Sequence, residues 1–245
     1  MTDFTEKLKK ALGTMQLFPD ENTLSRMELF TRRILEKNQV MNLTAITDED
    51  EFIEKHFVDS LSLLTYTEEG KAILSGKKEK MIDIGTGAGF PGLALKICCP
   101  QIDMTLNDSL RKRLVFLEEV IRELGLTGVR TLHMRAEDLG RDRKHRGAYP
   151  LVLARAVANL STLSEYALPL VQKNGRFIAY KGDHAAEEIR AAEQAVKKLG
   201  GSISEAKEFV LPGTELSRTF VVIRKTGETP AAYPRKAGIP SREPL

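Results

Sequence analysis

The chain has 245 residues, of which 42% are hydrophobic and 29% charged, so a disordered protein is excluded and one large domain with a substantial core is expected. No apolar run approaches the roughly 20 residues of a membrane span, and the first residues lack the apolar core of a signal peptide, so we expect a cytoplasmic protein without a membrane partner. The net charge of +3 is uneven: residues 1–75 contain 9 Lys+Arg against 14 Asp+Glu and residues 76–245 contain 28 against 20, which favours a polyanionic partner for the second part.

Residues 1–75 are expected to be helical and to form a cap on the rest of the chain. Their apolar side chains recur at helical spacing, which predicts a helix near the start, a second from about Asn22-Thr23 and a third before residue 65. The positions are Leu8, Leu12 and Met15; Leu24, Met27, Leu29, Phe30, Ile34, Leu35 and Val40; and Phe52, Ile53, Phe57, Leu61 and Leu64.

Two polar clusters interrupt these helices, Asn42-Leu43-Thr44-Ala45-Ile46 and His56-x-x-Asp59-Ser60-Leu61. Asn42 and Thr44 are suited to capping a turn, and His56 is suited to pairing with Asp59 on the helix surface. The pattern alone leaves a functional role for either cluster open.

The segment from Met81 to Gly92 is expected to carry the chemistry. It predicts a buried strand, a glycine-rich turn and a helix whose first turn contains Pro91. Gly85, Gly87 and Gly89 leave the backbone bare, so a ligand can lie against it. We therefore expect these three glycines to bind a cofactor.

Two cofactors use such a turn. The spacing Gly87-x-Gly89-x-x-Gly92 matches a dinucleotide fingerprint, which leaves a nucleotide-linked oxidoreductase as an alternative. The strand ends at Ile84, however, so that fingerprint begins two residues late. Counted from the strand end, Asp83-x-Gly85-x-Gly87-x-Gly89 resembles the first motif of Rossmann-like methyltransferases that bind S-adenosylmethionine.

A second strand is expected to end at Asn107-Asp108, because Ile102, Met104 and Leu106 alternate with polar residues. Asp108 lies about twenty residues beyond the glycines, where a Rossmann-like sheet places the carboxylate that binds ribose hydroxyls. Capping of the following helix, which spans roughly 110–124 and stops at Gly125, is the alternative role for Asp108.

Two further strands place candidates at the same edge of the sheet. A third strand over 129–134 is followed by Ala136 and Glu137, which are candidates for contacting adenine or ribose. The basic run 141–146 is interpreted as solvated surface, with a phosphate contact as the alternative. A fourth strand over 151–154 ends at Arg155, and we interpret Arg155 as functional because an arginine in that position requires an anionic or ribose partner.

The last third of the chain completes the sheet. We expect a helix over 163–171, a fifth strand over 176–182 with Lys181 at its end, a helix over 185–199, and an antiparallel hairpin of 203–211 with 219–223. The tail 233–240 has too much proline and glycine for a helix or a central strand, so it is an ordered arm or a loose end. The adjacent Cys98 and Cys99 form no disulfide framework or metal site and are expected to be buried near a helix end.

Eight motifs, in the same order along nearly the whole chain, together resemble the RsmG (GidB) family of bacterial 16S ribosomal RNA methyltransferases. They are Asn42-Leu43-Thr44-Ala45-Ile46, His56-x-x-Asp59-Ser60-Leu61, the segment 83–92, Asp108-Ser109-x-x-Lys112-Arg113-x-x-Phe116-Leu117, Arg135-Ala136-Glu137, Ala154-Arg155-Ala156-Val157-Ala158, Lys181-Gly182 and Tyr233-Pro234-Arg235-Lys236-x-Gly238-x-Pro240.

The resemblance implies an α/β fold: a Rossmann-like class I methyltransferase with a seven-stranded, mostly parallel sheet, helices on both faces and an N-terminal helical extension. It divides the chain into a helical cap (1–75), a methyltransferase core (76–228) and a basic, proline-containing tail (229–245). The family's cofactor contacts fall on Gly85, Phe90, Ala136, Glu137 and Arg155, with Asp108 at the ribose position. The family usually has aspartate where the fourth strand opens, and this chain has Pro150 there.

The implied reaction is methylation of N7 of one guanine in 16S ribosomal RNA, with S-adenosylmethionine as cofactor and the small ribosomal subunit or an assembly intermediate as partner. Guanine N7 has no proton to lose, so the reaction needs no general base. Arg155 and Lys181 are the expected catalytic residues, holding RNA phosphate or the acceptor edge of the guanine. We expect a monomer, and a non-catalytic RNA-binding factor or a methyltransferase for proteins or small molecules remain alternatives.

Overall fold

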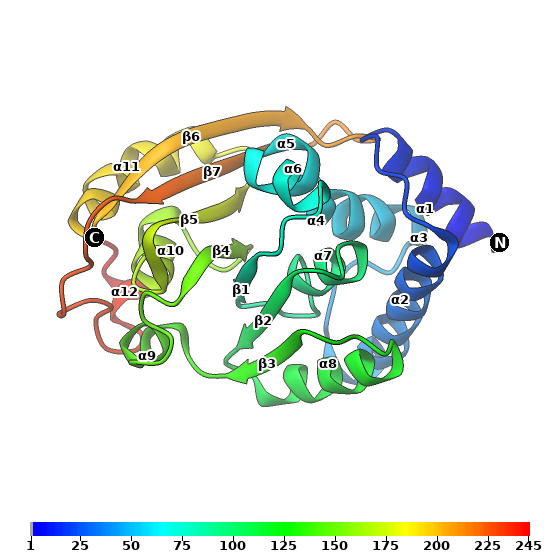
Figure 1. The fold of residues 1–245 in the computed structure, drawn as a ribbon, viewed down its shortest axis with the longest axis horizontal. Coiled ribbons are helices and arrows are strands. Elements are labelled where there is room, and N and C mark those ends of the chain that lie inside the picture. The colour runs from blue at the N-terminus through cyan, green and yellow to red at the C-terminus, as the bar shows by residue number, and fades with distance from the viewer. Residues whose placement is uncertain (1) are drawn as a thin grey trace.

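The computed structural model describes residues 2–245 and is built on a sheet of seven strands in the order β3-β2-β1-β4-β5-β7-β6 (Figure 1). Strands β1 to β5 are parallel, and β7 pairs antiparallel with both β5 and β6. The expected fold class is therefore confirmed. The bounds are β1 (Lys80–Ile84), β2 (Asp103–Asp108), β3 (Val129–His133), β4 (Tyr149–Arg155), β5 (Val171–Lys181), β6 (Gly201–Val210) and β7 (Ser217–Lys225).

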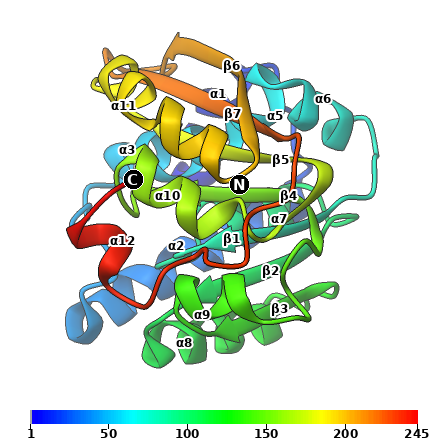
Figure 2. The same cartoon turned by 90° about the vertical axis from the view of Figure 1, so that its left-hand side faces the viewer.

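Helices cover both faces of this sheet because its central strands are apolar on both sides. Met81 in β1 belongs to one buried cluster and its neighbour Ile82 to the other, as the alternation of side chains along a strand requires. One face packs against α7 (Gly92–Cys98), α8 (Arg111–Glu123) and the helices that precede β1. The opposite face, which is toward the viewer in Figure 2, carries α9 (Ala136–Arg141), α10 (Leu160–Ala167) and α11 (Ala185–Lys198).

The helices that precede β1 share the first of these two cores. They are α1 (Asp3–Gly13), α2 (Glu21–Met41), α3 (Glu49–Phe52), the π-helical segment η1 (Ile53–Val58), α4 (Asp59–Leu61), α5 (Leu63–Tyr66) and α6 (Glu68–Leu74). Helix α2 starts slightly earlier than expected because the Asp20 carboxylate accepts a hydrogen bond from the Thr23 amide (2.8 Å) and caps it. Val40 was wrongly expected in the apolar face: it is 78% exposed, whereas its neighbour Met41 packs against the core.

Aromatic rings join these helices to the glycine-rich turn. The ring of Phe90 lies 5.1 Å from Phe30, 5.9 Å from Phe52 and 5.5 Å from Phe57, measured between centroids. Aromatic pairs at such distances pack favourably beyond the area they bury. The turn is therefore fixed from the side of the helical extension.

Three sequence-based boundaries were wrong. The helix expected over 163–171 ends at Ala167, because Pro169 has no N–H to continue the helical hydrogen bonds, and β5 already begins at Val171. Strand β4 begins at Tyr149, so Pro150 is its second residue, at an irregularity in the pairing with β5. The tail contains a short helix, α12 (Ile239–Arg242), in whose first turn the missing N–H of Pro240 costs nothing.

Other expectations of the sequence are confirmed. The strands β6 and β7 pair as an antiparallel hairpin, α11 has nearly the expected bounds, and Cys99 is buried directly after the end of α7. Asn42 adopts a left-handed conformation at the end of α2, and the Thr44 hydroxyl accepts from the Ile46 amide (3.0 Å), so both residues stabilise a turn. No helix within residues 2–245 is both long and apolar enough to cross a membrane.

We expect Gly89→Ala to destabilise the fold by about 2–4 kcal/mol, because it adds both backbone strain and a steric clash. Gly89 has φ +107°, and a Cβ there would lie 2.9 Å from Phe30 Cζ and 3.0 Å from Leu117 Cδ2. Gly125→Ala is the matched control, since Gly125 has φ +61° but nothing within 4 Å of a Cβ, and it should cost only about 1 kcal/mol. Urea unfolding measures both, and equal losses would contradict the packing role.

Candidate active site

The carboxyl ends of the parallel strands open onto two adjoining cavities. The first has a volume of about 500 Å³ and is bordered by the segments that follow β1, β2, β3 and β4. A crevice at this edge is where open α/β sheets bind their ligands. Of the expected cofactor residues, the structure brings Gly85, Asp108, Ala136 and Glu137 together in its wall.

Gly85 lines this cavity in a conformation that only glycine adopts readily. Its φ is +68°, and a Cβ at this position would lie 2.8 Å from Cγ2 of Val157 in the loop after β4. The two loops therefore approach each other closely only because Gly85 has no side chain. Gly85 therefore borders the cavity with backbone and no side chain, as the sequence predicted.

The other expected residues of the turn lie differently. Gly89 makes room for Phe30 and Leu117, and Gly87 donates its amide N–H to Asp108 Oδ2 (3.0 Å). The ring of Phe90 is buried in the aromatic cluster, and the guanidinium of Arg155 lies 5.6 Å from the ring centroid. Neither Gly87 nor Gly89 nor Phe90 borders the first cavity, so their contact with a cofactor stays a prediction.

Asp108 does not cap α8, whose N-cap residue is Leu110 without a side-chain cap, and its contact with ribose stays a prediction. Its Oδ1 accepts from the Leu110 amide (2.8 Å) directly before α8, and its Oδ2 accepts from Gly87 and from Arg113 Nη1 (3.3 Å). Each carboxylate oxygen has two lone pairs, so Oδ1 can accept one further hydrogen bond. The carboxylate is therefore fixed in orientation and retains capacity for a hydroxyl donor.

The second cavity, of about 610 Å³, lies beside the first and contains most of the charged side chains of the site. The cavities share Ala156 and Val157, and Ala156 has φ +55°, which is unusual for a residue with a side chain. The wall of the second cavity includes Lys55, His56, Asp59, Arg155, Lys181 and Arg218. Arg155 thus borders the second cavity and not the first, so its expected contact with the cofactor stays a prediction.

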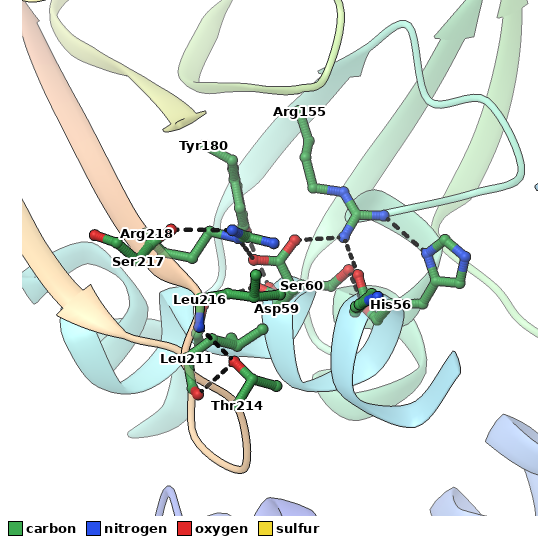
Figure 3. Close-up of polar contacts among 12 residues, drawn as sticks. His56, Asp59, Ser60, Arg155, Tyr180, Leu211, Thr214, Leu216, Ser217 and Arg218 are labelled. Atoms are coloured by element: carbon green, nitrogen blue, oxygen red, sulfur yellow. Dashed lines mark hydrogen bonds and ion pairs between the residues drawn. The ribbon is translucent and has the colours of Figure 1, made fainter. Parts of the chain in front are cut away.

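Asp59, in the helical extension, holds two arginines of the sheet (Figure 3). Its Oδ2 accepts from Arg155 Nη1 (2.8 Å), and its Oδ1 accepts from Arg218 Nε (2.9 Å). Arg155 also donates to the carbonyl oxygen of Lys55 (3.0 Å). The anionic partner that the sequence required for Arg155 is therefore a residue of this chain, and the two cations surround one buried carboxylate.

His56 does not pair with Asp59, and that interpretation of the sequence was wrong. Its Nδ1 lies 3.3 Å from Arg155 Nη2, its Nε2 lies 2.8 Å from Thr44 Oγ1, and its ring stacks on Phe90. Since a guanidinium only donates, Nδ1 must accept and the proton lies on Nε2. Burial and the charge of Arg155 lower the pKa of His56 to about 3, so the ring is neutral.

Lys181 is nearly buried at the end of β5 and is held by two acceptors. Its ammonium donates to the Ala158 carbonyl oxygen (2.7 Å) and forms an ion pair with Glu188 of α11 (2.7 Å). Glu188 also accepts from the Leu160 amide (2.7 Å), which fixes the carboxylate. One of the three ammonium donors is left for a ligand.

Asp83, the first residue of the glycine motif, is buried beside the turn and holds its end through a hydrogen bond. Its Oδ2 accepts from the Gly92 amide (2.9 Å), while Oδ1 has no hydrogen-bond partner among residues 2–245. Complete burial raises the pKa of this carboxyl to about 6. It holds the start of α7 against β1.

The basic run 141–146 is not simply a solvated surface. Arg146 donates to the carbonyl oxygens of Gly140 (2.8 Å), Tyr233 (2.8 Å) and Thr229 (2.7 Å). Arg141 donates to the carbonyl oxygen of Pro234 (2.8 Å). These two arginines satisfy backbone acceptors of the tail, because a chain without regular structure leaves its carbonyls unpaired.

Sequence reasoning missed several residues of the two cavities, notably Arg218, Arg113 and Tyr166. Arg218 stands at the start of β7, which lies between β5 and β6, and no local signal in the sequence distinguishes it. Arg113 falls within one of the eight motifs of the family resemblance and Tyr166 within the helix expected over 163–171, but neither was assigned to the site.

Comparison with known proteins shows the family to which the chain is similar. A family model for GidB, rRNA small subunit methyltransferase G, matches residues 23–217. The ribosomal RNA small subunit methyltransferase G of Desulforamulus reducens is 44% identical over 245 residues, covering 100% of both chains. The protein of the same name from Thermoanaerobacter pseudethanolicus is 49% identical over 215 residues, covering 86% of each chain.

Solved structures with little sequence identity share the fold. The [4+2]-cyclase SpnF is 10% identical, covers 85% of this chain and 97% of its own, and superposes with a TM-score of 0.57. A mutant of MtNAS is 16% identical, covers 84% of this chain and 75% of its own, and has a TM-score of 0.53. At such identity the likeness shows the fold alone.

We expect His56 to make stability depend on pH. Because folding lowers its pKa from 6.5 to about 3, the unfolded chain binds a proton that the folded chain does not, so this contribution is complete above pH 6.5 and is lost as the pH falls. Well below pH 6.5, this contribution to the free energy of unfolding falls by about 1.4 kcal/mol for each pH unit toward acid. Asp83, with its raised pKa, has the opposite slope between its unfolded value of 3.8 and about 6, so wild type alone conceals the effect.

The comparison of wild type with His56→Gln isolates the contribution of His56. The difference in free energy of unfolding, from urea titrations at about pH 6.5, 5.5 and 4.5, should shrink by about 1 kcal/mol over the first step, where the unfolded histidine starts half protonated, and by about 1.3 kcal/mol over the second. A difference that stays constant over this range would show that His56 titrates normally in the folded protein.

Proposed function

Because this chain belongs to the GidB family of small-subunit ribosomal RNA methyltransferases, we propose that it transfers a methyl group from S-adenosylmethionine to N7 of one guanine in 16S ribosomal RNA. The observation that carries the proposal is the pair of adjoining cavities at the carboxyl edge of the sheet, separated by Ala156 and Val157. One cavity suits an adenosine and the other suits an anionic acceptor. Transfer between two ligands requires this adjacency.

The first cavity fits S-adenosylmethionine by its size and its polar groups. The bare backbone at Gly85 would give the cofactor room, the Asp108 carboxylate would accept from its ribose hydroxyls, and Ala136 and Glu137 at the start of α9 would bind its adenine or ribose. When bound, the cofactor supplies a methyl group on a positively charged sulfur, so its own leaving group is neutral. The residues of this cavity bind and orient; none has to move a proton.

The second cavity suits a guanine within RNA. Arg155, Arg218 and Lys181 provide cationic donors for phosphate or for the acceptor edge of the base. Guanine N7 attacks with an existing lone pair, and the neutral His56 is bound by Arg155 rather than free to take a proton. The residues of this cavity therefore contribute by aligning the guanine and not by acid–base chemistry.

The remaining expectations belong to the same proposal. The small ribosomal subunit or its assembly intermediate is the partner, and the protein acts as a cytoplasmic monomer. Residues 1–75 act as the helical cap that supplies Asp59 and His56 to the acceptor cavity, residues 76–228 as the methyltransferase core and residues 229–245 as its tail. The basic excess of residues 76–245 supports a polyanionic partner.

We expect Arg155→Ala and Lys181→Ala each to lower kcat/KM for ribosomal substrate by about tenfold to a hundredfold, the loss that one charged hydrogen bond of roughly 1.5–3 kcal/mol implies. For Lys181→Ala the dissociation constant for S-adenosylmethionine should change less than threefold, because this side chain lies outside the first cavity. Arg176→Ala is the control: Arg176 pairs with Glu69 and borders neither cavity. Losses below tenfold for both variants at saturating cofactor would contradict the assignment.

The reaction is tested by transfer of labelled methyl from S-adenosylmethionine to small subunits from a strain that lacks this protein. Chemical cleavage at N7-methylguanosine should then locate the label at a single guanine of 16S RNA, and transfer RNA should stay unlabelled. Label in no RNA despite cofactor binding would indicate a protein or small-molecule acceptor. Binding of NAD in place of S-adenosylmethionine would indicate an oxidoreductase instead.

A further inference from the structure

The C-terminal arm, residues 229–245, is an ordered part of the molecule that lies against α9 and α10 (Figure 2). It carries one short helix, and most of its backbone has no strand or helix to satisfy it. Side chains of the core, from positions far away in the sequence, form hydrogen bonds with the backbone of the arm instead. The arm is therefore docked by specific contacts and not by regular structure.

A buried ion pair is the strongest of these contacts. Glu165 of α10 is 0% exposed, and its carboxylate accepts from the Arg235 backbone amide (2.7 Å), from Nε (3.0 Å) and from Nη2 (2.7 Å). A buried carboxylate without such partners is strongly destabilising. Core residue Glu165 therefore requires the arm in place.

The close packing of Pro234 on α9 supports this docking. A Cβ at Gly140 would lie 2.8 Å from Pro234 Cγ, so the glycine of α9 leaves space for the proline of the arm. Farther along, Thr162 of α10 donates to the carbonyl oxygen of the buried Pro240 (2.9 Å). The arm is thus held on both sides of its midpoint.

That midpoint, Gly238, reaches the first cavity. Gly238 borders the cavity together with Glu137 and Tyr166, and its amide N–H donates to Glu137 Oε1 (2.8 Å). Glu137 is one of the residues that we assign to adenine and ribose binding. One carboxylate therefore connects the arm with the first turn of α9.

We propose that the C-terminal arm is a structural part of the cofactor site: Gly238 closes the wall of the first cavity and holds Glu137 in the orientation that binds S-adenosylmethionine. This inference rests on the proposed function, since it assigns that cavity to the cofactor. It makes Gly238 a positioning residue. Cofactor affinity, rather than RNA binding, depends on the arm.

The test is calorimetric titration of S-adenosylhomocysteine into the full chain and into a variant that ends at Arg235. This variant keeps the ion pair with Glu165 and the packing of Pro234, so its melting temperature without ligand should fall by only a few degrees. The dissociation constant should rise at least tenfold. Lys236→Ala is the matched control within the arm, because this exposed side chain makes no hydrogen bond or ion pair among residues 2–245, and its affinity should equal that of wild type.

The outcomes separate the two proposals. Affinity of the shortened chain within twofold of wild type overturns the role of the arm and leaves the proposed function intact, whereas a full chain that does not bind S-adenosylhomocysteine overturns both. If the shortened chain does not fold, hydrogen exchange of the full chain decides. Ligand should then slow exchange severalfold in residues 236–242 as well as around residues 85 and 137, and protection that leaves the arm unchanged overturns the proposal.

Discussion

The structure of the site depends on one buried carboxylate. Asp59 comes from the helical extension, and it receives Arg155 from the end of β4 and Arg218 from β7. Two guanidinium groups at this short distance repel each other, and a buried carboxylate without partners is costly, so each of the three charges requires the others. The extension and the sheet must therefore close on each other in one arrangement, and the second cavity forms where they meet.

The aromatic cluster and the glycine turn transmit this arrangement to the first cavity. Phe90 packs against the helical extension, stacks on His56 and lies beneath Arg155. The turn that borders the first cavity is thus fixed by the same contacts that fix the second cavity. Alignment of two ligands requires such common support, because a small displacement between them lowers the rate steeply.

Both terminal segments of the chain contribute to the carboxyl edge of the sheet. The helices before β1 supply Asp59 and His56, and the arm after β7 supplies Gly238 beside Glu137. The central strands provide the backbone ends on which these segments converge. A Rossmann-like sheet leaves this edge open, and here segments from outside the sheet close it.

Local sequence patterns were enough to establish the strand, glycine turn and helix at 80–98, the sheet of seven strands, and the positions of Asp108, Glu137 and Arg155 at strand ends. These features follow from local periodicity and from where parallel strands end. The end of α10 was missed because the single Pro169 decides it. The helix in the tail was missed because proline and glycine content was taken to exclude a helix, whereas a proline in the first turn is tolerated. The link from Asp59 to Arg155 and Arg218, by contrast, exists only in the tertiary structure, since these arginines are 96 and 159 positions away from Asp59. Long-range pairing of that kind is set by the register of a hairpin and the placement of a helix on the sheet, and no local pattern encodes it.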